Sequence, residues 1–219
     1  MKYTLLFVYV LSIQLLVAQN NRALTINFTS LIDNEVLKVS TQNKNNISIE
    51  KLKFYLTNFS LSKDGETIWK EDKSYHLIDV SEPKSLVITL DLKEELEYDA
   101  ITFLLGTDSL TNVSGVMGGD LDPTKGMYWA WNSGYINFKL EGNSNNIPFE
   151  FHLGGYMPPY QTVQKITLKT KNNNRLNIKF NLSEFFAGID FSKEHKVMSP
   201  GNEAQKLSKA ISSLFYIIE

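Results

Sequence analysis

The 219-residue sequence contains no cysteine. This absence excludes disulfide bonds, thiolate metal sites, cysteine nucleophiles and a lipid anchor on an N-terminal cysteine. Any metal site must therefore use histidine, methionine, carboxylate or amide ligands, or a modified aromatic residue. Histidine is also scarce, because the chain has only three, at His76, His152 and His195.

The sequence also lacks a strong excess of charge of either sign. It has 22 Lys and Arg against 24 Asp and Glu, so no nucleic-acid partner is expected. The short motifs of serine hydrolases, zinc proteases, phosphate-binding loops and dinucleotide-binding folds are absent. A glycosidase that uses two carboxylates stays open, since those residues need not be neighbours in the sequence. We predict that the protein is not an enzyme.

Long apolar runs are missing except at the N-terminus. There, Lys2 precedes an almost unbroken apolar stretch over residues 5–17, which ends at Ala18. These are the features of a secretory signal, so we expect cleavage after residue 18 and a single domain over residues 19–219, located in the periplasm or secreted. No other segment approaches the roughly 18 apolar residues of a membrane helix, so no stable membrane insertion is expected.

Short segments in which apolar and polar residues alternate dominate the rest of the chain. Such alternation is typical of strands with one buried face. Asp64 and Gly65 predict a tight hairpin turn between two of these strands, because both residues tolerate positive φ angles. The predicted strands cover residues 24–28, 53–62, 67–69, 75–80, 86–91, 98–106, 129–141, 149–153, 165–169 and 176–182.

One long helix is predicted near the C-terminus, where apolar residues recur at helical spacing over residues 204–215. Asn202 followed by Gln205 suits a capped start of this helix. Residues 183–188 suit a short helical turn, and residues 107–125 form the one extended loop. The pattern predicts an all-β fold, mainly an antiparallel β-sandwich or distorted barrel, with one short C-terminal α-helix.

The three histidines are the first candidates for a metal site. His152 shares a strand face with Glu150, and His76 shares one with Ser74 and Ile78. Two imidazoles that converge would suit copper or zinc, whereas isolated histidines are commonly structural or surface residues. His195 and Met198 form a softer pair, and the alternative is a turn that fixes the start of the last helix.

Residues 127–135 are unusually aromatic. Within a strand, Trp129 and Trp131 would project from the same face and could stack on a sugar, shield a metal or fill a core. Asp120 and Asp122 precede them on a glycine-rich loop. These two carboxylates could bind calcium, although they are fewer than the six to eight oxygens that calcium prefers. Closing turns is an alternative role for both.

Several segments, in the same order along the chain, resemble the MbnP-like family of exported copper-binding proteins. The most specific runs from Asp120 through Pro123 into the string Met-Tyr-Trp-Ala-Trp-Asn-Ser-Gly-Tyr, which begins at Met127. The others cover residues 54–61, 75–79, 103–109, 112–115, 139–142, 151–155 and 197–201.

The resemblance implies a β-rich fold that binds copper, as Cu(I) or Cu(II), through two histidines, which by position are similar to His76 and His152. In some relatives a tryptophan is also a ligand, after a partner di-haem cytochrome c peroxidase-like enzyme has oxidised it to kynurenine. That tryptophan stands two residues before the first histidine, where this chain has Ser74. Trp129 and Trp131 belong to the family signature and are expected to be buried beside the site.

Three functional hypotheses follow. The first is an exported protein that captures or carries copper at His76 and His152. The second is a binding module for a carbohydrate or a protein, centred on Trp129 and Trp131. The third is a protein without metal that serves as the partner of the di-haem enzyme.

Overall fold

The computed structural model describes residues 22–218. The predicted signal, residues 1–18, lies outside the described residues. The strands are β1 (Arg22–Ile32), β2 (Glu35–Val36), β3 (Ile47–Lys63), β4 (Glu66–Lys70), β5 (Tyr75–Asp79), β6 (Val87–Leu92), β7 (Ala100–Leu105), β8 (Tyr128–Trp129), β9 (Gly134–Ser144), β10 (Ile147–Gly154), β11 (Gln164–Lys169), β12 (Arg175–Asn181), β13 (Lys196–Val197) and β14 (Phe215–Ile218). The helices are α1 (Ser109–Val113), α2 (Ser183–Ala187) and α3 (Asn202–Ser212), with short 3-10 turns at Pro83–Leu86, Gly119–Leu121 and Pro123–Lys125.

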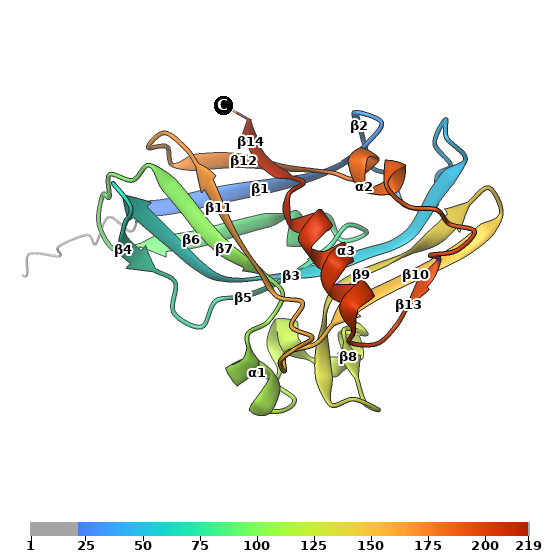
Figure 1. The fold of residues 1–219 in the computed structure, drawn as a ribbon. Helices are drawn as coiled ribbons and strands as arrows, with labels where there is room; N and C mark the ends of the chain where they lie inside the picture. Colours follow the sequence, from blue (N-terminus) through green and yellow to red (C-terminus); the bar gives the residue numbers. More distant parts are fainter. Residues whose placement is uncertain (1–21, 219) are drawn as a thin grey trace, which may run out of the picture.

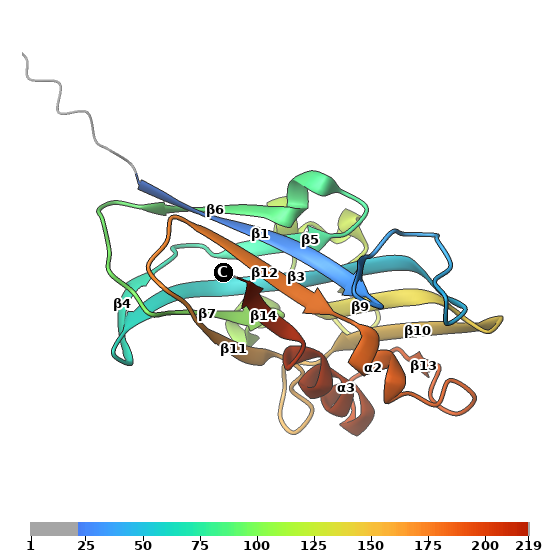
Figure 2. The same ribbon diagram turned by 90° about the horizontal axis from the view of Figure 1, so that it is seen from above.

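The strands form two sheets that pack face to face (Figures 1 and 2). The smaller sheet has the order β14-β12-β1-β2, with β6 also paired to β1. The larger has the order β11-β7-β3-β9-β10-β13, with β4 and β5 on β3 and β8 on β9. All pairs are antiparallel except β1 with β12 and β10 with β13. The predicted all-β sandwich with a short helix is confirmed.

Alternating apolar residues from both sheets form the core between them. Phe54 of β3 contacts Phe138 of the neighbouring strand β9, and it reaches across the core to Phe180 of β12, with 5.7 Å between ring centroids in each pair. Phe180 stacks in turn on Phe215 of β14 at 4.6 Å. Aromatic contacts of this kind add to the area-based gain from burying the rings.

The hairpin of β3 and β4 confirms the predicted turn, because Asp64 and Gly65 both have positive φ angles, 51° and 84°. The predicted strand over residues 129–141 is wrong at its start. Residues 130–133 form a turn between β8 and β9, and Ser133 at its end has a φ of 45°. Trp129 and Trp131 therefore do not share one strand face.

The C-terminal helix is shorter than predicted. It ends at Ser212, and Phe215 belongs to β14, because this residue completes the aromatic core next to Phe180. The predicted cap is also wrong: Asn202 is the first helical residue, and Gln205 donates its side-chain N–H groups to the carbonyls of Pro159 and Gln161. The short helical turn after residue 183 is confirmed as α2. None of the helices in residues 22–218 is long and apolar enough to cross a membrane.

Candidate functional site

His152 lies on the outer face of the larger sheet, the face turned away from the smaller sheet. Its Nε2 is 2.8 Å from Oε1 of Glu141 on the neighbouring strand β9, and the side chain is buried. Burial lowers the pKa of His152, although the hydrogen bond to Glu141 opposes this effect. The imidazole is therefore neutral at neutral pH. With Nε2–H donating to the carboxylate, the ring's lone pair is on Nδ1.

Glu141 joins His152 to a charged network. Its carboxylate lies 2.7 Å from Nζ of Lys51 and 3.3 Å from Nζ of Lys139. Burial opposes ionisation of Glu141, but the hydrogen bonds from Lys51 and His152 and the nearby positive charges outweigh it and lower the pKa of Glu141 to about 2. Glu141 therefore stays an anion that orients the imidazole.

His76 has a similar glutamate partner in a different part of the sheet. Its Nε2 lies 3.0 Å and 2.9 Å from the two carboxylate oxygens of Glu71, and its ring meets the edge of Phe59. The side chain is partly exposed and borders a hollow of about 450 Å³ that Asp79 and Asp120 also line. Both of these carboxylates are paired with lysines, to Lys53 and Lys125 respectively.

The structure does not bring His76 and His152 together. The strand β5 that carries His76 is separated from β10 by β3 and β9, a span of roughly 14 Å at the usual strand spacing. Strand pairing places His152 beside Lys139, on the outer face of the sheet. It places His76 beside Leu56, whose side chain faces the core. The two imidazoles thus lie on opposite faces of one sheet. Within residues 22–218, no three His, Asp or Glu side chains are grouped as metal ligands.

The position that holds a tryptophan in some relatives has a structural role here. Ser74 is buried, and its Oγ accepts a hydrogen bond of 3.0 Å from the backbone N–H of Phe59. This bond fixes the irregular segment of β3 beside His76. The serine hydroxyl is engaged with the backbone.

His195 and Met198 flank the two-residue strand β13. Since they are three residues apart on extended backbone, their side chains leave on opposite sides. His195 is exposed, and its backbone carbonyl accepts from the N–H of Glu150, while Met198 is half-buried. The structure therefore does not form the predicted His–Met pair.

Asp120 ties its loop to strand β5, whereas Asp122 closes a turn. Asp120 accepts from the backbone N–H of Leu77 at 2.9 Å and from Nζ of Lys125 at 2.6 Å. Asp122 accepts from the N–H and hydroxyl of Thr124. The bonds of Asp120 hold the loop on the larger sheet, and those of Asp122 match the turn-closing alternative in the sequence analysis.

The two tryptophans have different environments. Trp129 is 5% exposed and packs its ring on the backbone of Gly154, as the expectation of a buried scaffold requires. Trp131 is 66% exposed, so the same expectation is wrong for this residue. It sits in the turn after β8, with its ring 5.5 Å from that of Trp129. Of the two tryptophans in the aromatic segment, Trp129 is therefore buried and Trp131 is exposed to solvent.

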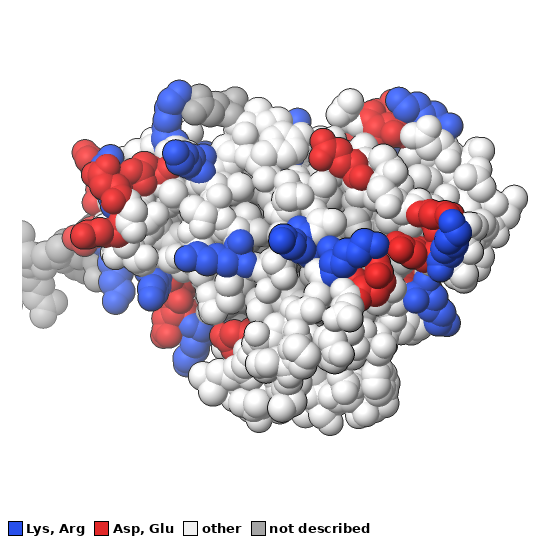
Figure 3. Space-filling model, viewed as in Figure 1, with Lys and Arg blue, Asp and Glu red and all other residues white. Residues whose placement is uncertain are grey.

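Trp131 belongs to a larger exposed apolar surface. We name residues 109–119, 127–135 and 155–162 the apolar lobe; these three segments contain no Lys, Arg, Asp or Glu. In Figure 3 the corresponding lower part of the molecule is white, below a band of charged side chains. Its exposed large apolar residues are Leu110, Val113, Val116, Met117, Trp131, Met157 and Tyr160.

Hydrogen bonds join the three segments of the apolar lobe. Asn112 accepts from the backbone N–H of Tyr135 at 2.8 Å, and the Tyr135 hydroxyl accepts from the N–H of Met117. Ser109 donates to the carbonyl of Tyr156 at 2.9 Å. The lobe is therefore a fixed surface. Sequence reasoning missed the apolar lobe. The three uncharged segments can be seen in the sequence, but the sequence does not show that they come together in the fold.

Comparison with known proteins agrees with this fold. A model of the MbnP family matches residues 21–199. Among solved structures, MbnP from Methylosinus trichosporium superposes with a TM-score of 0.61, at 12% sequence identity, over 83% of this chain and 82% of that chain. At this identity the superposition supports the fold alone. No curated protein matches the chain.

Proposed function

The chain belongs to the MbnP family, and we propose that it is an exported, non-enzymatic binding protein of copper handling that docks a partner protein through its apolar lobe. The observation that carries the proposal is the exposure of Leu110, Trp131 and Met157 on one uncharged surface, at 73%, 66% and 64%. Large contiguous apolar patches on soluble proteins mark interaction sites.

The composition of the lobe favours a protein as the occupant. Tryptophan, tyrosine and methionine are enriched where proteins meet, and charged residues are depleted at the centre of such interfaces. The Trp131 ring already lies against that of Trp129, with 5.5 Å between centroids, so the side chain loses less conformational entropy on binding. The partner we propose is the di-haem peroxidase-like enzyme that the family resemblance implies. We expect this enzyme to bind the lobe through an apolar surface.

A carbohydrate is the weaker candidate for the same surface. A sugar site needs polar groups around its stacking ring, to bond with the hydroxyl groups of the ligand. The exposed large side chains of the lobe other than Tyr160 are aliphatic, thioether or indole groups. One side of the Trp131 ring also leans toward Trp129. These surroundings favour a protein surface over a glycan.

We propose copper as the ligand because of the family resemblance. The positions of the two histidines determine how we propose that it is bound. Since His76 and His152 lie apart, each copper ion would bind one imidazole beside one glutamate, at Glu71 or Glu141. Each glutamate already contacts Nε2 of its histidine, so copper would bind the other ring nitrogen, Nδ1, while the glutamate orients the imidazole. Copper binding at either pair is expected to be weaker than at a site with two imidazoles.

The docking proposal is tested by titrating the purified di-haem peroxidase-like protein against the chain. We expect Trp131→Ala to weaken binding by roughly 30-fold, because the loss of a central aromatic anchor costs about 2 kcal/mol. Ile68→Ala is the matched control, since Ile68 is an exposed apolar residue on β4, outside the lobe. Equal affinity of the two variants would contradict docking at the lobe.

A further inference from the structure

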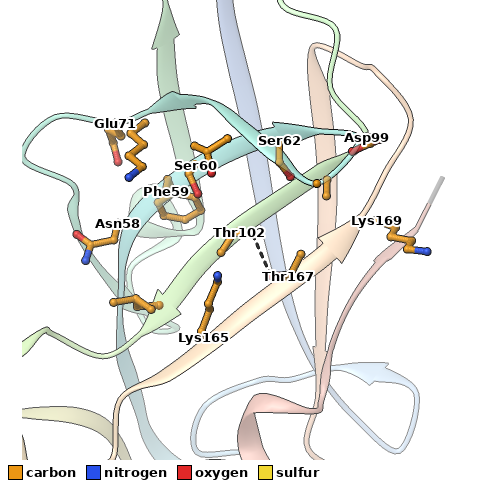
Figure 4. A pocket seen from close by; sticks show the side chains of 15 residues that line it. Asn58, Phe59, Ser60, Ser62, Glu71, Asp99, Thr102, Lys165, Thr167 and Lys169 are labelled. Carbon is orange, nitrogen blue, oxygen red and sulfur yellow. Dashed lines mark hydrogen bonds between the residues drawn. The ribbon is translucent and has the colours of Figure 1, made fainter.

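A second surface, unrelated to the apolar lobe, lies on the part of the larger sheet formed by β3, β4, β7 and β11. There the hairpin of β3 and β4 curls over the outer faces of β7 and β11 and encloses a hollow of about 790 Å³ (Figure 4). We name it the lysine hollow, after Lys70, Lys165 and Lys169, which line it.

The strand register fills the floor of the hollow with hydroxyl groups. One row across four strands consists of Lys70, Ser60, Thr102 and Thr167. The next row consists of Thr67, Ser62, Ala100 and Lys169. Figure 4 shows Ser60, Thr102 and Thr167 on neighbouring strands, with the two threonine hydroxyls 2.9 Å apart. Ser60 and Ser62 have no side-chain hydrogen bond to any residue in the range 22–218, so both are available to a ligand.

The positive charge of the hollow is not neutralised by ion pairs. Lys70, Lys165 and Lys169 have no carboxylate partner among the described residues. On the other half of the same outer face, Lys51, Lys53 and Lys139 each lie within 3.3 Å of a carboxylate.

The two acidic residues that line the hollow, Glu71 and Asp99, already have partners. Glu71 binds His76, and Asp99 accepts from the backbone N–H of Asp64. With three ammonium groups against these two carboxylates, the lining keeps a net charge of +1 (3 − 2) around its hydroxyl floor, which suits an anion that also carries many hydroxyl groups.

We propose that the lysine hollow binds an acidic oligosaccharide, with its carboxylates at the three lysines and its hydroxyl groups on the serine and threonine floor. Hydroxyl side chains both donate and accept, as sugar hydroxyls do. A neutral glycan would need an exposed aromatic ring to stack on, and the one aromatic residue of the lining, Phe59, is fully buried.

An acidic peptide fits the hollow less well than an acidic sugar. Extended peptides bind by adding to the free edge of a sheet or by placing side chains in apolar pockets. The hollow lies on a sheet face whose backbone groups are paired between the strands, and most of the residues that line it have polar side chains.

The test is calorimetric titration with an oligogalacturonate, a neutral galactose oligomer of equal length and a glutamate peptide. The wild-type chain should bind the uronate and neither of the other two. The triple variant Lys70→Gln, Lys165→Gln, Lys169→Gln should bind it at least about tenfold more weakly, because three charge-assisted contacts are lost.

Two further variants separate a built site from general attraction of anions. The triple variant Lys38→Gln, Lys93→Gln, Lys209→Gln makes the same charge change at exposed lysines elsewhere and should leave the uronate affinity unchanged. Thr102→Val removes a floor hydroxyl without changing charge and should weaken binding several-fold.

The proposal would be overturned by no uronate binding to the wild-type chain, equal binding of the glutamate peptide or the neutral oligomer, or equal losses in the two lysine variants. Thermal unfolding of every variant verifies that it is folded.

Discussion

Glu141 organises the outer face of the larger sheet at the scale of single residues. The Glu141 carboxylate contacts Lys51, Lys139 and His152, and these partners lower the pKa of Glu141 to about 2. A carboxyl group whose pKa falls on folding stabilises the native state above its unfolded value of about 4.5. That stability is lost as the pH falls toward the folded value.

We therefore predict that the free energy of unfolding falls by about 1–2 kcal/mol between pH 4.5 and pH 2 because of Glu141, after allowance for solvent screening. The low pKa of neutral His152 adds a loss that begins below about pH 6.5, where the unfolded chain takes up the proton. Urea unfolding at pH 7, 5, 3 and 2 measures both losses. Glu141→Gln should flatten the acid limb, whereas Glu150→Gln, with an exposed partner in Lys196, should not. Parallel curves for the wild type and Glu141→Gln would contradict this assignment.

The proposed copper binding can also be tested at single residues. If His76 and His152 bind separately, each single alanine variant removes only its own share of the copper left after loading and desalting, and the double variant removes both. Elemental analysis measures this directly. His195→Ala is the control, because its side chain is exposed and belongs to neither pair. Loss of all copper in either single variant would contradict separate sites and establish a shared one.

The strand faces of both histidines could be predicted from the alternation of their neighbours. His76 pairs with Leu56 beside Ile78, and His152 lies opposite the face of Phe151, as expected. What alternation leaves open is which strands become neighbours. The two strands between β5 and β10 were therefore not predictable, and neither were the glutamates that each histidine meets.

At the scale of elements, β8 is the part of the apolar lobe that packs against β9 and β10 of the larger sheet. A Cβ at Gly154 would lie 2.6 Å from the Trp129 ring and 2.7 Å from the carbonyl oxygen of Tyr135. Glycine at this position permits β8 to lie close to β10. Trp129 in turn supports the turn that presents Trp131.

We predict that Gly154→Ala destabilises the fold by about 2–3 kcal/mol, because a clash with backbone leaves no low-energy relaxation. It should also change the tryptophan fluorescence, since Trp129 must shift. Gly118→Ala is the matched control, as a Cβ there meets no atom within 4 Å. Urea unfolding followed by fluorescence measures both effects, and equal stability of the two variants would contradict the close packing.

Element boundaries were predictable where alternation and turn chemistry agreed. The hairpin at Asp64 and Gly65 is such a case. The segment from residue 129 to 141 was not, because its aromatic residues suit a strand as well as a turn. The predicted end of α3 was wrong for a similar reason. Phe215 has helical spacing, but it belongs to β14, from which its ring completes the core.

At the scale of the whole molecule, the sandwich followed from many short strands and one terminal helix. The parallel pairing of β1 with β12 joins strands about 150 residues apart, and local patterns hold no information about such a contact. The apolar lobe has the same origin. Its three segments are separated in the sequence, and the topology brings them together below the larger sheet in the view of Figure 1.

The most direct test of docking is amide hydrogen exchange of the chain with and without saturating di-haem peroxidase-like partner. Interface backbone becomes protected when a partner excludes water and suppresses local opening. We predict protection over residues 109–117, 129–132 and 156–160, with none on β4, β7 or β11 around the lysine hollow. Protection confined to those strands, or no protection at all, would contradict the account.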